Sequence, residues 1–347
     1  MYRFLIRKLL FLLKPETVHN LIVKLLKNGL KIPGIPAILS GSYSIKDKRL
    51  KTKFLGLEFN NPVGLAAGFD KNAEAYNEFR NFGFSFIEIG TVTPEPQPGN
   101  PRPRSFRIPA DQGLINRMGF NNKGVDYAAE RLRTNKPKLI IGGNIGKNTH
   151  TPNEKSVDDY LDAFKKLYVH VDYLVINLSC PNIKNLNELQ DKEKTMGIIH
   201  TLDDERKKFN NYKPILLKIS PDLTTEQLDD AIDIYYQTGI DGIIATNTTV
   251  SRENLKTPED KIKSIGNGGL SGKALTKRST DFIKYISEKS NNEIPVIAVG
   301  GIMTVEDALE KLRAGATLIQ IYTGFIYNGP AFVKQINKAI LKEKTNN

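Results

Sequence analysis

The sequence predicts an α/β protein in which a (β/α)8 TIM barrel follows a small amino-terminal domain of two membrane-associating helices. Two observations predict the barrel: eight short, β-rich apolar runs follow Pro62, and amphipathic stretches lie between or after them. Eight strands alternating with helices in roughly 280 residues fit the size of such a barrel. A doubly wound open sheet is the alternative, but the glycine-rich dinucleotide fingerprint with its downstream acid is missing.

The amino-terminal segment combines apolar and basic side chains. Eight of the ten residues from Phe4 to Leu13 are apolar, but Arg7 and Lys8 interrupt the run, which is too short to span a bilayer. A second helix is predicted from Pro15, and its apolar residues share one face at helical spacing: Val18, Leu21, Ile22, Leu25 and Leu26. Residues 1–60 carry 12 Lys or Arg against 3 Asp or Glu, so most of the net charge of +12 is local.

This local charge indicates an anionic membrane surface as a partner and argues against nucleic acid. A plain helical cap packed on the main domain is the alternative. We expect residues 1–40 to form an amphipathic membrane-associating domain, and residues 41–347 to form the barrel domain. The sequence shows no recognisable signal peptide, which favours a peripheral protein on the cytoplasmic face of a bacterial inner membrane. We also expect a monomer.

The predicted barrel strands follow one another at regular intervals. They are Val63–Ala67, Ser85–Thr91, Leu139–Ile145, Tyr173–Leu178, Ile215–Ile219, Gly242–Thr246, Pro295–Val299 and Leu318–Tyr322. Helices are predicted at Val157–Val169, Thr225–Tyr236, Thr304–Leu312 and Phe332–Leu341. Two connections are unusually long, Thr93–Asn121 and Thr249–Gly272, and long ordered loops tend to carry function.

Barrel active sites are built at the carboxyl ends of the strands, and nearly all of these ends are polar or glycine here. With one cysteine and four scattered histidines, we expect no disulfide and no metal site, so redox chemistry requires an organic cofactor. Glycines in "AVGGI" and "IYTGF", after strands 7 and 8, favour bound phosphate over mere tight turns.

Lys218 lies inside the apolar run "ILLKIS", where a core-facing ammonium needs an anionic partner, and a reduced flavin would supply one. The alternative is a lysine that points outward and reaches solvent. Asparagines at strand and loop ends suit a flat ligand with alternating carbonyl and N–H groups, such as a pyrimidine. Cys180 is the candidate base or nucleophile, although a free cysteine is often only a small buried hydrophobe.

A set of motifs covering nearly the whole chain resembles the dihydroorotate dehydrogenase family, and specifically its membrane-associated, quinone-using class. The motifs are "NPVGLAAGFDKN", "IEIGTVTPEPQPGNPRPRSFR", "GLINRMGFNN", "NIGKN", "NLSCPN", "GIIATNTT", "GGLSGKAL", "VGGI" and "IQIYTGF". The resemblance implies oxidation of dihydroorotate to orotate in pyrimidine biosynthesis, with FMN as the hydride acceptor and a membrane quinone as the final acceptor.

The resemblance also implies a set of site residues. FMN would contact Ala67, Gly68, Thr91, Asn144, Asn177, Lys218, Thr246, Gly272, Gly301, Tyr322 and Thr323. Dihydroorotate or orotate would contact Lys71, Asn116, Arg117, Met118, Gly119, Phe120, Asn177, Asn182, Asn247 and Thr248. A quinone tunnel would involve His19, Arg104 and Tyr322, and Cys180 would be the catalytic base.

One position departs from the quinone-using class, which usually has serine where this chain has Cys180. Cysteine there is typical of the soluble classes, which use fumarate or NAD, so the class assignment depends on the amino-terminal segment, "RPRSFR" and His19. An FMN-dependent tRNA dihydrouridine synthase is a further alternative. Such an enzyme would need basic charge spread over an RNA footprint and a separate carboxyl-terminal helical domain, and the sequence has neither.

Overall fold

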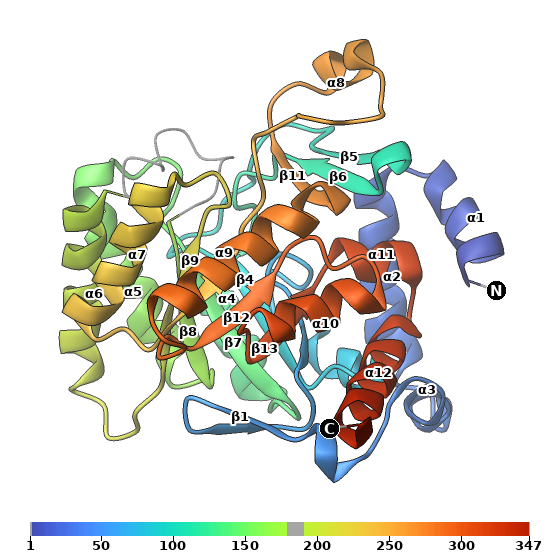
Figure 1. The fold of residues 1–347 in the computed structure, drawn as a ribbon, viewed down its shortest axis with the longest axis horizontal. Helices are drawn as coiled ribbons and strands as arrows, with labels where there is room; N and C mark the ends of the chain where they lie inside the picture. Colours follow the sequence, from blue (N-terminus) through green and yellow to red (C-terminus); the bar gives the residue numbers. More distant parts are fainter. Residues whose placement is uncertain (1, 179–190, 347) are drawn as a thin grey trace.

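A closed barrel of eight parallel strands forms the centre of the computed structural model, which describes residues 2–178 and 191–346 (Figure 1). Each predicted strand is confirmed to within two residues at either end. In order around the barrel the strands are β3 (Val63–Leu65), β4 (Phe86–Val92), β7 (Ile140–Ile145), β8 (Tyr173–Asn177), β9 (Ile215–Ile219), β10 (Gly242–Ala245), β12 (Val296–Val299) and β13 (Leu318–Ile321). Because β13 pairs with β3, the carboxyl ends of all eight strands meet at one rim.

Helices surround the barrel and connect its strands (Figure 1). The four predicted helices are confirmed as α5 (Ser156–Tyr168), α7 (Thr225–Thr238), α10 (Val305–Arg313) and α12 (Phe332–Asn346). The others are α4 (Val125–Thr134), α6 (Lys192–Arg206), α8 (Glu259–Ile265), α9 (Thr276–Lys289) and α11 (Thr323–Asn328). Short 3-10 turns are η2 (Lys48–Leu50), η3 (Tyr76–Phe82), η4 (Pro109–Asp111), η5 (Asn153–Lys155) and η7 (Lys273–Leu275), with η3 between β3 and β4.

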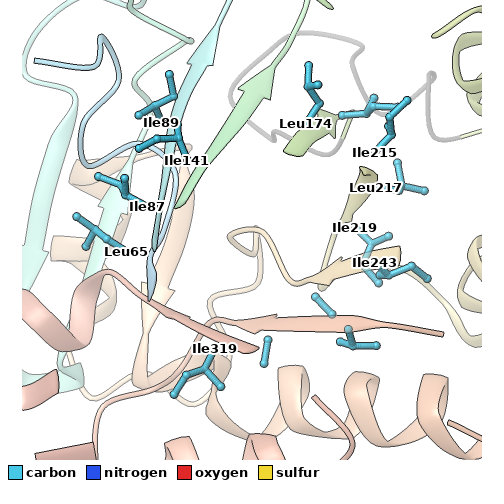
Figure 2. Packing of buried hydrophobic residues seen from close by; sticks show 14 of the residues in the cluster. Leu65, Ile87, Ile89, Ile141, Leu174, Ile215, Leu217, Ile219, Ile243 and Ile319 are labelled. Atoms are coloured by element: carbon cyan, nitrogen blue, oxygen red, sulfur yellow. The ribbon is translucent and has the colours of Figure 1, made fainter. Parts of the chain in front are cut away.

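Side chains alternate along each strand between the helices and the barrel interior. On β9, Leu217 and its neighbours at odd positions join the aliphatic layer beneath the helices, whereas Leu216 packs in the separate interior cluster. The residues labelled in Figure 2 show this outer layer, which draws leucine and isoleucine from most of the strands. The same alternation turns Lys218 inward, so the outward-pointing alternative for this lysine is excluded.

Aromatic rings fill the lower interior of the barrel. Phe86 and Tyr173 are buried there, and a Cβ at Gly64 or Gly142 would fall 2.2–2.3 Å from atoms of these two rings. A hairpin of β1 (Thr52–Phe54) and β2 (Leu57–Phe59), which the sequence did not predict, adds Phe59 to this cluster. The ring centroids of Phe59 and Phe86 lie 5.1 Å apart in an edge-to-face arrangement.

The two long connections meet above the rim and form a small antiparallel sheet. Its strands are β5 (Ser105–Ile108) and β6 (Gly113–Asn116), from the connection after β4, and β11 (Gly269–Gly272), from the connection after β10. Figure 1 places this sheet between the barrel and the first helices. Parts of both connections are therefore β-strands that are paired with each other.

The amino-terminal segment forms a π-helical turn η1 (Tyr2–Ile6) followed by α1 (Arg7–Leu12), α2 (Pro15–Gly29) and a third helix, α3 (Ile35–Tyr43). The prediction of two helices missed α3, because the cluster of glycine and proline before it reads as a break. Pro36 in fact occupies the first turn of α3, where its missing N–H is not needed. Residue 40 lies within α3. The domain boundary expected at that residue stays a prediction.

Exposed apolar side chains concentrate on this segment. Of the fourteen large hydrophobic residues that are exposed in the described part of the chain, ten lie between Phe4 and Ile38. Within the described ranges, no helix is both long enough and apolar enough to cross a membrane.

Replacing Phe59 with alanine should lower the free energy of unfolding by about 3–5 kcal/mol, because it would leave a cavity next to the Phe86 ring in a closed interior. Urea unfolding followed by circular dichroism measures this loss. Val250→Ala, at a side chain that is 56% exposed, should change the same quantity by no more than about 0.5 kcal/mol. Equal stability of the two variants would contradict the role of Phe59 as part of the interior packing.

Candidate active site

One cavity of about 930 Å³ runs from the amino-terminal helices to the rim of the barrel. Ile6, Val18 and Ile22 line its outer part, and Lys218 and Thr246 line the part inside the rim. The wall between them comes from the small sheet and from the turn after β3. The cavity thus connects an apolar entrance with a polar interior.

The floor of the cavity is a hydrogen-bonded polar layer inside the barrel. The Lys218 ammonium lies 3.0 Å from a carboxylate oxygen of Glu88, which is completely buried. The same carboxylate accepts hydrogen bonds of 2.7 Å each from the side-chain amides of Asn144 and Gln320. The anionic partner expected for Lys218 is therefore present within the protein itself.

Asn177, at the end of β8, links this layer to the substrate side of the rim. Its side-chain amide donates to Thr91 Oγ1 at 2.8 Å and to Asn144 Oδ1 at 3.4 Å. Its side-chain oxygen, Oδ1, accepts from the side-chain amide of Asn247 at 3.1 Å. Asn247 in turn accepts from the backbone N–H of Thr248 at 2.8 Å. Four strand ends are held in one arrangement by these bonds.

Most of the residues expected to hold a flavin lie together. The cavity is lined by Ala67, Gly68, Thr91, Asn177, Lys218, Thr246, Gly272, Gly301, Tyr322 and Thr323, whereas Asn144 lies beneath it and bonds to Glu88.

The expected phosphate subsite fits an anion that approaches the backbone closely. Gly272 and Gly301 have φ of +104° and +72°, and a Cβ on either would come within 2.3 Å of backbone atoms. Thr323 adds a hydroxyl that lies 2.8 Å from Ser271 Oγ. Positive-φ glycines beside hydroxyl groups suit phosphate recognition, so the residues present fit a flavin nucleotide.

The expected substrate residues divide into three groups. Lys71, Asn116, Met118, Gly119, Phe120, Asn177, Asn247 and Thr248 line the cavity. Arg117 does not, because its guanidinium donates to the backbone carbonyls of Pro103 and Asn267 at 3.2 Å and so anchors the connection after β10. Cys180 and Asn182 lie outside the described residues.

The expected tunnel residues lie along the outer half of the cavity. His19 packs edge-to-face on Phe69 at 5.3 Å between ring centroids, and Phe69 packs on Tyr322 at 5.1 Å. Arg104 does not line the cavity, but its guanidinium pairs with Glu16, which does, at 2.8 Å. Although burial would raise the pKa of Glu16, hydrogen bonds and positive charge from Arg104 and Arg102 lower it below its ordinary value.

Both ring residues of the tunnel are uncharged at neutral pH. Burial at the cavity wall, reinforced by the positive charge of Lys71, lowers the pKa of His19 to about 4, and only Glu16 opposes the shift. Burial raises the pKa of Tyr322 to about 12. A neutral imidazole and a neutral phenol add no charge to the cavity where they line it, which suits an apolar ligand there.

Several residues of the site were not predicted from the sequence. Glu88 lies in the apolar run "FIEIG", and its signal is similar to that of Lys218, since a lone carboxylate in a buried strand also needs a partner. Gln320 carries the same signal within "LIQI". Glu16 gave no signal, because acidic residues are common in the first turn of a helix.

His19 should remain neutral down to about pH 5 in the folded protein. Its folded pKa of about 4 lies below the ordinary value of 6.5, so the unfolded chain binds the proton more tightly. The stability contributed by neutral His19 is present above pH 6.5 and is lost as the pH falls toward 4. NMR of the imidazole nitrogens, assigned with His19→Asn, measures this titration. A midpoint near 6.5 would contradict burial of the ring.

Comparisons with known proteins agree with this architecture. The family model described as dihydroorotate dehydrogenase matches residues 49–343. A protein of Christiangramia forsetii named dihydroorotate dehydrogenase (quinone) is 55% identical over 343 residues, which cover 99% of each chain. One of the same name from Actinobacillus pleuropneumoniae is 45% identical and covers 97% of this chain and 98% of its own.

Solved structures give the same result. The dihydroorotate dehydrogenase of Eimeria tenella, crystallised with ferulenol, superposes with a TM-score of 0.86 at 37% identity, over 96% of this chain and 92% of its own. The ligand-free form gives a TM-score of 0.87 over 96% and 95%. With a matching family model, full-length relatives of the quinone type and a shared closed barrel, the chain belongs to the dihydroorotate dehydrogenase family.

Proposed function

We propose that this protein oxidises dihydroorotate to orotate in pyrimidine biosynthesis and passes the electrons to a membrane quinone. The observation that carries the proposal is a cavity that joins a largely apolar outer part, under the amino-terminal helices, to the polar rim of the barrel. A substrate at the rim and a quinone at the entrance would reach the same cofactor from different directions. The full-length relatives named as quinone enzymes support this assignment over the fumarate- and NAD-linked alternatives.

Dihydroorotate dehydrogenases are generally flavin-dependent, and we propose FMN as the flavin. FMN, when bound, supplies a hydride acceptor that a quinone can reoxidise. Lys218 would offer positive charge to it, Thr91 and Asn177 polar contacts, and the cavity-lining backbone at Gly272 and Gly301 a place for its phosphate. The tRNA-modifying alternative has less support, because the full-length relatives are named as quinone-type dihydroorotate dehydrogenases.

The substrate would lie against the asparagines of the rim. Asn116, Asn177 and Asn247 line the cavity and together offer donors and acceptors to a planar carboxylated pyrimidine. Lys71, whose ammonium donates to Asn121 Oδ1 at 2.5 Å, would offer positive charge to the substrate carboxylate. Asn182 is proposed as a further clamp.

Cys180 is proposed as the base that removes the C5 proton of dihydroorotate. It follows Asn177, which ends β8 at the rim, by three positions in the sequence. A thiolate is a competent proton acceptor when nearby cations stabilise it.

Anaerobic addition of dihydroorotate should bleach the yellow purified enzyme, and Cys180→Ala should slow this bleaching by about 10²- to 10⁴-fold because it removes the base. Cys180→Ser should keep part of the rate, because a hydroxyl can still accept a proton. Stopped-flow absorbance at the flavin band measures both. Bleaching of the alanine variant by dithionite is the control for bound flavin. Reduction of that variant by dihydroorotate at nearly the wild-type rate would remove the assignment.

We also propose that the amino-terminal helices dock on an anionic membrane. Phe4, Leu9 and Leu12 are 77%, 58% and 82% exposed, and the basic residues of the segment lie among such side chains. Apolar burial and attraction to anionic lipid act together in this arrangement. The cytoplasmic face and the monomeric state stay predictions.

The double variant Leu9→Glu/Leu12→Glu should bind vesicles that contain anionic lipid at least about tenfold more weakly, because two side chains lose their apolar burial. Co-sedimentation measures binding. Reduction of a long-chain quinone in the vesicles should fall more than reduction of a small soluble dye. Val169→Glu is the matched control, since Val169 is 58% exposed at the end of α5, far from α1 (Figure 1). Unchanged vesicle binding of the double variant would exclude this docking surface.

A further inference from the structure

Glu88 is a buried acid that belongs to no group of proposed ligands. It lies on β4, points into the barrel, and has no exposed surface. Its carboxylate receives hydrogen bonds from Asn144 of β7, Lys218 of β9 and Gln320 of β13. These three donors come from strands on both sides of β4 around the barrel, so the carboxylate joins distant parts of the interior.

Glu88 is set back from the cavity, while two of its partners reach it. Lys218 and Gln320 line the cavity, and Glu88 does not. The carboxylate therefore acts on a bound molecule through these side chains and through its own, more distant field. At the cavity the field of the nearer ammonium exceeds the opposing field of the more distant carboxylate.

The negative charge of Glu88 also favours the ammonium form of the Lys218 side chain. An ammonium buried without a counter-ion loses much of its solvation, and the neutral amine becomes the favoured form. A carboxylate at 3.0 Å reverses this preference and fixes the direction of the ammonium. Because a carboxylate only accepts hydrogen bonds, it also turns the N–H side of Asn144 toward itself, which leaves Asn144 Oδ1 to accept from Thr91 at 2.5 Å.

We infer that Glu88 is a positioning residue that keeps Lys218 charged and directed at the cavity, and that it thereby raises the reduction potential of the flavin held there. The inference rests on the proposed function, since it requires a flavin at the rim. Reduced flavin carries negative charge on its pyrimidine side, and a fixed cation stabilises that form relative to the oxidised one. Without Glu88, the Lys218 ammonium would lose the buried carboxylate that lies 3.0 Å away and fixes its direction.

The test is the midpoint potential of the bound flavin in full-length protein, measured by equilibration with reference dyes from pH 6 to pH 9. In Glu88→Gln the ratio of oxidised to reduced flavin at pH 9 should rise about tenfold, equivalent to a fall of ~30 mV for a two-electron couple. A potential equal to wild type across the whole range would overturn the inference.

A double-mutant comparison separates positioning through Lys218 from a general loss of structure. In the Lys218→Met background, Glu88→Gln should not lower the potential further, because the cation through which it acts is already gone. A purely structural role would lower the potential in both backgrounds and would overturn the inference. Glu58→Gln, which removes an exposed acid paired with Lys51 at the hairpin, should leave the potential unchanged.

Glu88→Asp covers the case in which Glu88→Gln fails to fold. The shorter carboxylate keeps the charge but lengthens the ion pair, so the potential at pH 9 should move in the same direction by a smaller amount. A potential at or above that of wild type would overturn the inference. Flavin content of wild-type protein, measured by absorbance after addition of FMN, tests the proposed function separately, because a chain that binds no flavin refutes that proposal whatever Glu88 does.

Discussion

The alternation of side chains along eight parallel strands is the constraint on which the rest of this structure depends. Each strand gives one face to the helices and the other to the interior, and closure of the barrel leaves no edge at which the pattern could change. The outward positions are aliphatic almost throughout. The inward positions change along the barrel axis, from aromatic rings at the bottom to carboxylate, ammonium and amides at the top.

This division assigns different tasks to the two halves of the interior. The lower half buries mainly apolar side chains, and the hairpin of β1 and β2 adds further rings to it. The upper half contains charge, which is costly to bury unless it is paired and hydrogen-bonded. The bonds around Glu88 offset that cost and at the same time order the floor of the cavity. The same alternation of side chains therefore produces both the stabilising lower half of the interior and the polar upper half.

The barrel was predictable because its strands are short apolar runs with polar ends, a signal that is local in the sequence. The small sheet of β5, β6 and β11 was not, since its strands have four residues each and Asn116 pairs with Gly269, far along the chain. The direction of Arg117 was equally hidden, because its carbonyl partners belong to two separate loops. Pairing across such distances depends on the assembled fold, whereas the cavity-lining asparagines could be located from the strand ends alone.

The contacts of the first residues with α11 have a consequence for biosynthesis. Tyr2 donates to the carbonyl oxygen of Ile326 at 2.7 Å, and Arg7 donates to that of Tyr327 at 3.0 Å, across more than 300 residues. On the ribosome, the amphipathic helices emerge more than 300 residues before the surface that holds them. Until α11 has been made, the apolar side chains of these helices lack the partners that they have in the folded protein. The outer wall of the cavity can therefore form only after α11, even though most of its side chains are made much earlier.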